Sequence, residues 1–154
     1  MGSKFKGTFE EKVSLESYIK LFRASEIIKS KISTITHSFG YSDSQFYVMD
    51  VLYHLGSLPQ KVLAEKTMRT EGNITMIINN LLKRKVIKRT KSKDDGRFHL
   101  ISLTEKGMAE FEKLFPEFVR EVQKVFSILT NEEKLLLQNL CKKLGVSLKE
   151  KLSD

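Results

Sequence analysis

Residues 81–97 read LLKRKVIKRTKSKDDGR, and this stretch decides which fold we expect. It starts as the end of an amphipathic helix, continues into the β-branched pair Val86 and Ile87, and reaches SKDDG, whose residues favour a turn. Residues 83–97 carry eight basic and two acidic side chains, a net +6 out of +8 for the whole chain. Charge gathered on so few residues indicates a polyanionic partner, whereas evenly spread lysines indicate only solubility.

The residues on both sides of the turn predict a β-hairpin with a charged tip over 86–103. Its two strands, 86–91 and 97–103, are short and rich in β-branched or aromatic residues. On the return strand Ile101 and Leu103 are expected to face the core. Thr104 is expected to cap a helix that runs to about residue 128, with a kink at Pro116 because proline removes a helical donor.

Upstream of the hairpin, the apolar spacing predicts a helix over 71–84, which Thr70 caps. A short helix from about Pro59 and a tight break at TMRT (67–70) precede it. At about 100° per residue, one side of the 71–84 helix is apolar and is expected to be buried. That stripe comprises Ile74, Ile77, Ile78, Leu81 and Leu82. The opposite side and its flanks carry Arg69, Gly72, Asn73, Met76, Asn79, Asn80 and Lys83. Asparagine offers a donor and an acceptor side by side, as an adenine edge requires.

Long helices are predicted at both ends of the chain. Residues 1–13 are polar and are expected to fray, and a helix over 14–38 ends at Gly40. Ser42 with Gln45, and Thr130 with Glu133, have the spacing of capping boxes that open two further helices. The last helix is expected to close at Gly145. The end helices are longer and more apolar than one small lobe can cover, which indicates burial against a second copy.

Composition excludes several classes of protein. The single Cys141 permits no intramolecular disulfide and is expected to pack buried or half-buried; the low cysteine content fits a cytoplasmic, reducing compartment. No apolar run reaches the roughly 18 residues of a membrane span, and the start of the chain lacks the apolar segment of a secretion signal. The three histidines lack metal-ligand spacing, and no phosphate-binding glycine loop or nucleophile elbow occurs. We therefore expect no enzyme, no cofactor and no metal.

The predicted order is helix, helix, short helix, helix, hairpin, helix, helix, which is typical of a winged helix-turn-helix. Over nearly the whole chain the sequence resembles the MarR family of bacterial transcription regulators. Asp95-Gly96-Arg97 followed by LISLTEKG (100–107) resembles that family's wing signature. LAEK (63–66) resembles its first helix-turn-helix helix, and NIT (73–75) and LLKR (81–84) resemble its recognition helix. Lys85 stands where the family usually has glycine, so a different helix exit is expected.

The resemblance implies a mainly α-helical fold with a small β-hairpin wing. It implies one MarR-type domain over 1–154, with a DNA-binding lobe at 42–104 (wing 86–103) and dimerisation helices at 14–38 and 105–150. The implied protein is a homodimeric repressor that places its recognition helices in successive major grooves, about 34 Å apart, of a palindromic double-stranded operator. It also implies release by a small aromatic or phenolic ligand, for which Phe22, Tyr53 and His54 are the candidate binding residues.

Candidate DNA contacts follow from the basic hairpin, the amide-bearing helix face and the resemblance together. Lys91 and Lys93 flank the hairpin tip and are expected to reach phosphates. The resemblance places Arg97 near the minor groove, with Asp95 orienting it through a charge-assisted hydrogen bond. The full set is Arg69, Thr70, Asn73, Thr75, Met76, Asn79, Asn80, Lys83, Lys91, Lys93, Asp95 and Arg97.

Two other interpretations account for the same residues. The polar helix face could be merely solvated, and the aspartates could be ordinary turn residues. Alternatively, the chain could be a winged-helix interaction module whose basic face docks an acidic protein or RNA. Attachment to a membrane surface fits less well, because it calls for a basic amphipathic helix and not for a hairpin.

Overall fold

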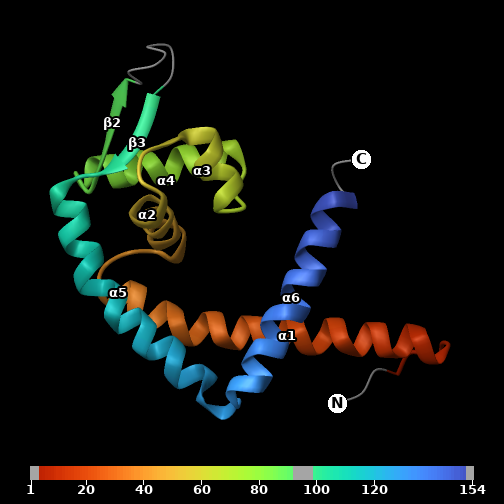
Figure 1. The fold of residues 1–154 in the computed structure, drawn as a ribbon. Coiled ribbons are helices and arrows are strands. Elements are labelled where there is room, and N and C mark those ends of the chain that lie inside the picture. Colours follow the sequence, from red (N-terminus) through yellow and green to blue (C-terminus); the bar gives the residue numbers. More distant parts are fainter. Residues whose placement is uncertain (1–3, 92–98, 152–154) are drawn as a thin grey trace.

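The structure is a computed structural model that describes residues 4–91 and 99–151, with side chains up to Leu148 (Figure 1). Its elements are α1 (Phe9–Ser38), α2 (Asp43–Leu55), β1 (Leu58–Pro59), α3 (Gln60–Lys66), α4 (Glu71–Lys83), β2 (Ile87–Lys91), β3 (His99–Leu103), α5 (Glu105–Val125), the 3-10 turn η1 (Phe126–Ile128) and α6 (Asn131–Lys151). The strands form one antiparallel sheet in the order β1-β3-β2. The prediction of a mainly α-helical winged helix-turn-helix is confirmed.

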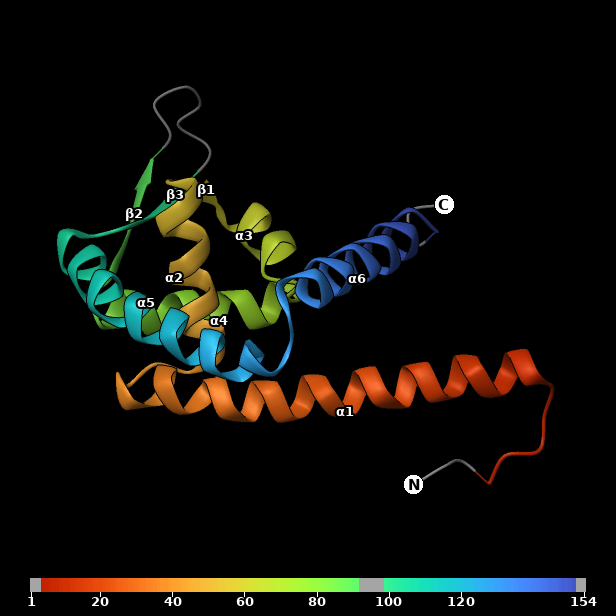
Figure 2. The same cartoon turned by 60° about the horizontal axis from the view of Figure 1, so that its bottom comes forward.

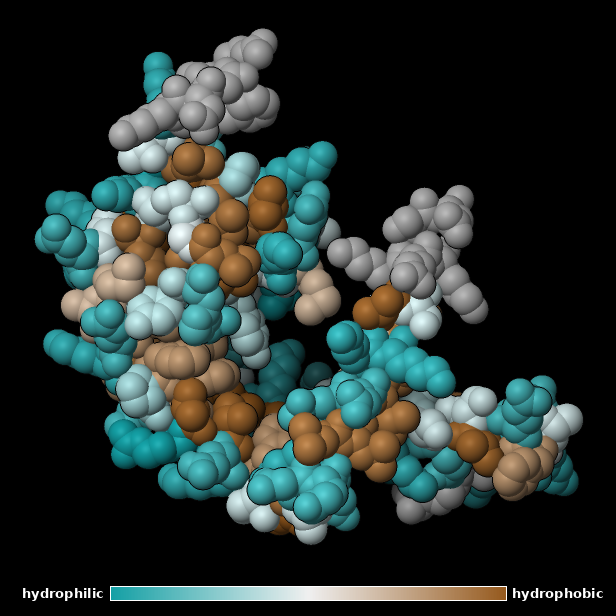
Figure 3. Space-filling view, in the orientation of Figure 1, coloured by the Kyte–Doolittle hydropathy of each residue, from teal (hydrophilic) through white to brown (hydrophobic). Residues whose placement is uncertain are grey.

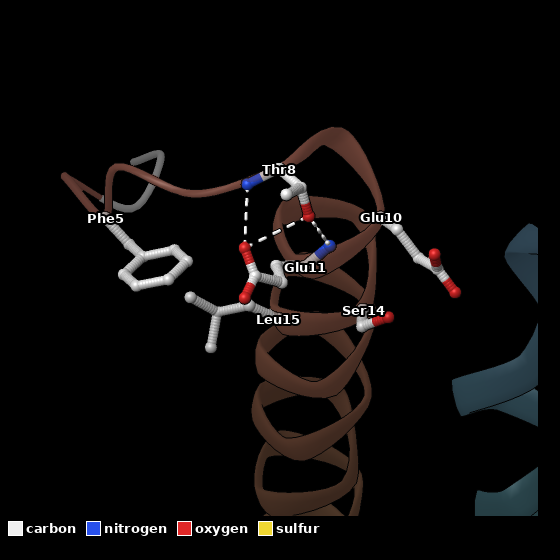
Figure 4. A pocket seen from close by; sticks show the side chains of 6 residues that line it. All are labelled: Phe5, Thr8, Glu10, Glu11, Ser14 and Leu15. Carbon is white, nitrogen blue, oxygen red and sulfur yellow. Dashed lines mark hydrogen bonds between the residues drawn. The ribbon is translucent and has the colours of Figure 1, made fainter.

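The first helix starts earlier than we expected. α1 begins at Phe9, so the prediction that residues 1–13 fray is wrong for residues 9–13, which belong to this helix. Thr8 and Glu11 form a capping box, in which the Thr8 amide donates to Glu11 Oε2 at 2.7 Å and the Glu11 amide donates to Thr8 Oγ1 at 3.2 Å. Figure 4 shows this cap beside a shallow hollow into which Phe5 and Leu15 project. The cap satisfies amide groups that a helix start otherwise leaves to water.

The expected caps of the other long helices are present. Ser42 with Gln45 and Thr130 with Glu133 form capping boxes, and Thr104 accepts a hydrogen bond from the Gly107 amide at 3.0 Å. α5 continues through Pro116. The prediction that Gly145 closes the last helix is wrong, because α6 continues to Lys151. A single interior glycine costs a helix only about 1 kcal/mol relative to alanine, which its neighbours can offset.

The hairpin lies where the sequence predicted it, but a third strand joins it. Ile87 pairs with Leu103, and Lys91 pairs with His99. β1 adds to the other edge of β3 through the pair Leu58 and Ile101. The sequence did not predict this two-residue strand, and Pro59 precedes α3 as its N-cap instead of occupying its first turn. The hairpin tip lies outside the described residues.

The core of the lobe forms where α4, the sheet, α2 and α5 meet. Ile74, Ile78 and Leu81 of α4 are fully buried and Ile77 is nearly so, as the helical stripe predicted, while Leu82 is half-buried. Ile101 and Leu103 of β3 face inward as expected. Rings of α2 and α5 stack on one another, with Phe46 and Phe111 centroids 5.7 Å apart. This stack joins the lobe to α5, which extends beyond it.

The end helices extend away from the lobe. α1 has 30 residues, about 45 Å at about 1.5 Å per residue. Figure 2 shows α6 leaving the end of α5 and lying apart from α1. Figure 3 shows apolar surface on these helices outside the lobe. No helix within residues 4–91 and 99–151 is long and apolar enough to cross a membrane.

Candidate nucleic-acid interface

A tight turn positions α4 against α3. The turn contains Met68 in the left-handed conformation, with φ of 52°. The Met68 amide donates to the Glu65 carbonyl at 3.3 Å and the Arg69 amide donates to the Ala64 carbonyl at 2.9 Å, which is the Schellman pattern of a helix end. Thr70 then caps α4 by accepting from the Asn73 amide at 3.4 Å, as predicted. The turn holds α3 and α4 in a helix-turn-helix arrangement.

α4 buries one side and presents the other to solvent. The predicted DNA contacts of α4 are all exposed, and so are the two that precede the helix, Arg69 and Thr70. Those on the helix are Asn73, Thr75, Met76, Asn79, Asn80 and Lys83. Thr75 differs from the others, because its hydroxyl accepts from Gln60 Nε2 and donates to the Glu71 carbonyl, both at 2.8 Å. Its hydroxyl therefore ties α4 to α3 within the protein.

The wing brings further cations beside this face. Arg89 and Lys91 of β2 are exposed and alternate along the same side of the strand, whereas Lys88, also exposed, lines a hollow with Met108 and Glu112 of α5. Arg89 Nη2 donates to Gln60 Oε1 at 3.3 Å, so Gln60 connects the wing to α4 through Thr75. Sequence reasoning missed Gln60, because no local pattern marks a residue whose two partners lie on other elements. The predicted contacts Lys93, Asp95 and Arg97 lie outside the described residues.

One member of the basic block does not belong to this surface. The Arg84 guanidinium carbon lies 3.9 Å from the centroid of the Tyr41 ring, and Arg84 Nη1 donates to the Gly40 carbonyl. Its guanidinium therefore faces the end of α1. Counting charges along the sequence placed Arg84 with the hairpin lysines, but the end of α4 turns its side chain elsewhere.

The exit from α4 has the geometry that glycine prefers. Lys85 adopts φ of 59°, its amide donates to the Leu82 carbonyl at 2.9 Å, and the Val86 amide donates to the Leu81 carbonyl at 3.3 Å. This is again the Schellman pattern. The backbone at Lys85 therefore has the left-handed conformation that a glycine adopts after the end of a helix. We had expected the lysine to give a different helix exit.

Replacing this lysine by glycine is expected to stabilise the protein. Lys85→Gly removes the steric penalty of a side chain in the left-handed region, about 1–2 kcal/mol, less the added backbone entropy of glycine. We expect a net gain of about 1 kcal/mol in the free energy of unfolding, measured by urea denaturation. The matched control is Lys85→Ala, which removes the same charge but keeps a Cβ. Equal stabilities of the two variants would contradict a strained helix exit.

Of the three predicted ligand residues, Tyr53 and His54 lie together with ring centroids 5.2 Å apart, whereas Phe22 lies elsewhere. Tyr53 packs on Phe111, with centroids 4.7 Å apart, and His54 Nε2 lies 3.4 Å from Asp50 Oδ1. Phe22 instead stacks on Tyr18 along α1. Burial raises the pKa of the Asp50 carboxyl, and His54 opposes that shift.

A hollow of about 340 Å³ lies between α1, α2 and α5. Ile28, Ile32 and Phe118 supply apolar walls, and Tyr47 and Asp43 supply polar groups. Asp43 Oδ1 accepts a hydrogen bond from Thr36 Oγ1 at 2.8 Å. Burial raises the pKa of the Tyr47 hydroxyl, and Asp43 adds to the shift. This hollow has the size and mixed polarity of a small-molecule site.

Two remaining expectations concern Cys141 and metals. Cys141 is exposed in the single chain, so the prediction of a buried or half-buried cysteine is wrong for it. In the described part of the chain, no group of three His, Cys, Asp or Glu side chains could hold a metal ion.

A helix-turn-helix flanked by a basic wing, mounted on long helices, defines a winged-helix transcriptional regulator of the MarR type. A family model described as "Transcriptional regulator SarA/Rot" matches residues 30–114, more than half of the chain, and the chain belongs to this family. It is therefore a DNA-binding transcriptional regulator and not an enzyme.

Individual relatives agree with this assignment. The HTH-type transcriptional regulator MhqR of Bacillus subtilis is 28% identical over 137 residues, covering 89% of this chain and 94% of MhqR. AbsC, a MarR family transcriptional regulator from Streptomyces coelicolor, shares the fold with a TM-score of 0.81 at 18% identity, covering 96% of this chain and 99% of AbsC. BpsR of Bordetella bronchiseptica, whose DNA binding is regulated by 6-hydroxynicotinic acid, superposes with a TM-score of 0.76 at 22% identity, covering 84% of this chain and 98% of BpsR.

Proposed function

We propose that the protein is a homodimeric repressor that binds a palindromic operator in the cytoplasm. α4 enters the major groove, and the wing follows the phosphate backbone on either side of its tip. The observation that carries this proposal is the exposed side of α4, where amide side chains and Lys83 face solvent and which Gln60 connects to Arg89 of β2. Phosphate contacts from the wing supply affinity, and base contacts from α4 supply sequence preference.

The chemistry of α4 favours A·T base pairs. Asn73, Asn79 and Asn80 offer the paired donor and acceptor that match adenine, and Met76 offers an apolar tip to the thymine methyl group. Guanine is read by arginine or lysine. Arg69 precedes the helix, and of these residue types α4 itself carries only Lys83, in its last turn. The adjacent Arg84 is engaged with Gly40 and Tyr41. We therefore place the base contacts of α4 on A·T-rich half-sites.

Exposed apolar side chains on α1 and α6 support the dimer. Leu136, Leu140 and Leu144 recur along one side of α6, and each is more than half exposed. On α1, Phe9, Leu21 and Phe22 are also exposed. Burying a leucine side chain contributes about 1.5–3 kcal/mol, so covering this surface by a second copy is strongly favourable. The predicted dimerisation helices at 14–38 and 105–150 contain these residues, except Phe9.

The hollow between α1, α2 and α5 is the proposed effector site. Its apolar walls fit a small aromatic ring, and the Asp43 carboxylate at its edge can accept from a phenolic hydroxyl. Lys29 also lines the hollow but pairs with Glu26 at 4.0 Å, so the charged groups of the lining are net negative and repel a carboxylate. A phenol is therefore favoured over an aromatic acid. Regulation of BpsR by 6-hydroxynicotinic acid supports a small aromatic effector in general, but not the preference for a phenol over an acid. We place the effector in this hollow and not at the predicted set, because Phe22 lies apart from Tyr53 and His54.

Selection of bound duplexes from a random pool tests the proposed function. We expect enrichment of an A·T-rich palindrome bound by one dimer, with steep loss of affinity as salt rises. Binding of RNA or an acidic protein without preference for a duplex would support the alternative of a winged-helix interaction module.

Repeating the selection with phenol and with benzoate tests the effector site. We expect phenol to release the protein from DNA at a lower concentration than benzoate does.

Two substitutions separate base reading from phosphate binding. Asn79→Ala is expected to change the selected sequence at one position of each half-site, at a cost of about 1–3 kcal/mol for the preferred base. Arg97→Ala is expected to weaken binding to all sequences and to lower the slope of log affinity against log salt by about 1 for each subunit. Salt titrations on the selected and a scrambled duplex measure both. An unchanged salt slope for Arg97→Ala would remove Arg97 from the interface.

A further inference from the structure

Four side chains connect the end of α4 to both long helices that meet the lobe. Tyr41 follows α1, Arg84 follows α4, and Lys106 and Glu110 belong to α5. Tyr41 donates its hydroxyl hydrogen to Glu110 Oε2, and the Arg84 guanidinium lies over the Tyr41 ring at 3.9 Å. These contacts join the end of α4 to α5 and to the residues that follow α1. In them the Arg84 side chain turns away from solvent-exposed Lys83 and toward Tyr41.

Each group in this cluster has more than one partner. Arg84 donates to the Gly40 carbonyl, and its Nη2 lies 3.9 Å from Glu110 Oε2. Lys106 Nζ donates to the Arg84 carbonyl at 2.9 Å and lies 3.7 Å from Glu110 Oε1. The Arg84 carbonyl belongs to the C-cap of α4, where the helix leaves its carbonyl groups free for such donors. The end of α4 is therefore held by α5 through its backbone, and by the end of α1 through its side chain.

The cluster is built as a rigid connection. Tyr41 is almost completely buried, and Arg84 and Glu110 are each about one-third exposed (35% and 34%). Burial raises the pKa of the Tyr41 hydroxyl well above its usual range, so that the group remains a hydrogen-bond donor. The Arg84 guanidinium stacks on Tyr41, donates to the Gly40 carbonyl and lies near Glu110, so it has few alternative positions. A lysine could not make this set of contacts.

We propose that Tyr41, Arg84, Lys106 and Glu110 are positioning residues that set the separation and angle between the two recognition helices of the dimer. This rests on the proposed dimeric function. The proposed dimer contact lies on α1 and on α6, which follows α5 along the chain, and the cluster fixes α4 relative to α5 and to the end of α1. It therefore decides which half-site spacing the dimer accepts.

Half-site spacing is a sensitive readout because DNA is helical. One added base pair moves a half-site by about 3.4 Å along the axis and turns it by about 34°. A rigid dimer cannot follow this change, whereas a dimer with loosely attached lobes can. General destabilisation lowers the amount of active protein equally for every duplex, so it leaves the relative affinities for different spacings unchanged.

The test compares affinities for palindromes whose central spacing is the selected one, one base pair shorter or one base pair longer. We expect the wild type to lose about 10-fold in affinity at the altered spacings, comparable to a mismatched base pair, and Arg84→Met to lose only about 2-fold. Arg120→Met is the matched control, because Arg120 pairs with Glu117 on the surface of α5 alone. It is expected to retain the wild-type dependence on spacing.

Milder variants keep the test decisive if Arg84→Met does not fold. Lys106→Met removes the donor to the Arg84 carbonyl and is expected to broaden the accepted spacing, whereas Lys106→Arg keeps a donor and is expected to behave as wild type. Relative affinities of Arg84→Met and Lys106→Met that parallel the wild type at every spacing would overturn the positioning role alone. A wild type that binds no palindrome, or binds as a monomer, would overturn the proposed function as well.

Discussion

Gly107→Ala is expected to lower the free energy of unfolding by about 3 kcal/mol, at the upper end of what overpacking a core causes. A Cβ on Gly107 would lie 1.9 Å from the Val86 carbonyl oxygen and 2.8 Å from the Val86 carbonyl carbon. Both are backbone atoms, so no side-chain rotation relieves the clash. The start of α5 must instead move away from the start of the wing.

That movement breaks the hydrogen bonds that join α5 to the wing. The Thr104 amide donates to the Val86 carbonyl at 3.0 Å, and Thr104 Oγ1 donates to the Lys85 carbonyl at 2.8 Å. Thermal unfolding should show a midpoint lowered by roughly 10 °C, given about 2–4 °C per kcal/mol for a chain of this size. DNA affinity should fall too, because the wing shifts relative to α4.

Gly145→Ala is the matched control for this substitution. Gly145 is an interior position of α6, and in the described part of the chain a Cβ built on it meets nothing within 4 Å beyond its chain neighbours and the backbone of its own helix. Alanine there is expected to stabilise the helix by up to about 1 kcal/mol. The same chemical change thus has opposite signs at two glycines. A Gly107→Ala protein as stable as wild type would show that the close approach of α5 to Val86 is absent.

Leu140→Lys is expected to convert the dimer into monomers and to lower operator affinity by about 100-fold or more. Leu140 lies between Leu136 and Leu144 on the exposed stripe of α6. A lysine at the centre of a buried apolar interface loses its hydration without gaining a partner. In a dimer, binding of one lobe to its half-site holds the second lobe close to the other half-site, and this high effective concentration raises the affinity about 10²–10⁴-fold. Separate monomers lose this gain. Sedimentation measures the oligomeric state, and titration of the palindrome measures affinity.

Gln138→Lys provides the control for added charge. Gln138 lies about 160° around the helix from Leu140, at about 100° per residue, and is exposed. It lines a hollow between α5 and α6 and not the leucine stripe. This variant is expected to remain dimeric and to bind the operator at least as well as wild type. A dimeric Leu140→Lys protein with unchanged affinity would exclude the leucine stripe of α6 from the interface.

Local patterns predicted most of the lobe. The stripe of α4 from Ile74 to Leu81 is buried, the hairpin lies at the expected residues, and the caps at Ser42, Thr70 and Thr104 are present. Each of these depends on residues within one or two turns of each other, which sequence spacing reports directly. The Thr8 capping box was also readable from spacing, but the polar character of its surroundings concealed it.

Interactions between distant residues were not predictable. β1 exists because Leu58 meets Ile101, 43 positions away along the chain. Gln60 joins Thr75 to Arg89, and Arg84 reaches back to Tyr41. Gly145 was expected to end α6, but a glycine closes a helix in this way when it itself adopts the left-handed conformation, and Gly145 does not have a positive φ.

Local sequence patterns were sufficient to predict a winged-helix DNA-binding regulator. Periodicity, caps and a block of positive charge are local properties, and together they define α4, the wing and the face between them. Which charges face solvent and which hold the lobe together depends on how the helices pack. Lys83 stays exposed while its neighbour Arg84 stacks on Tyr41. The reason is that successive side chains of a helix point in different directions, so only Arg84 reaches the residues packed between α1 and α5.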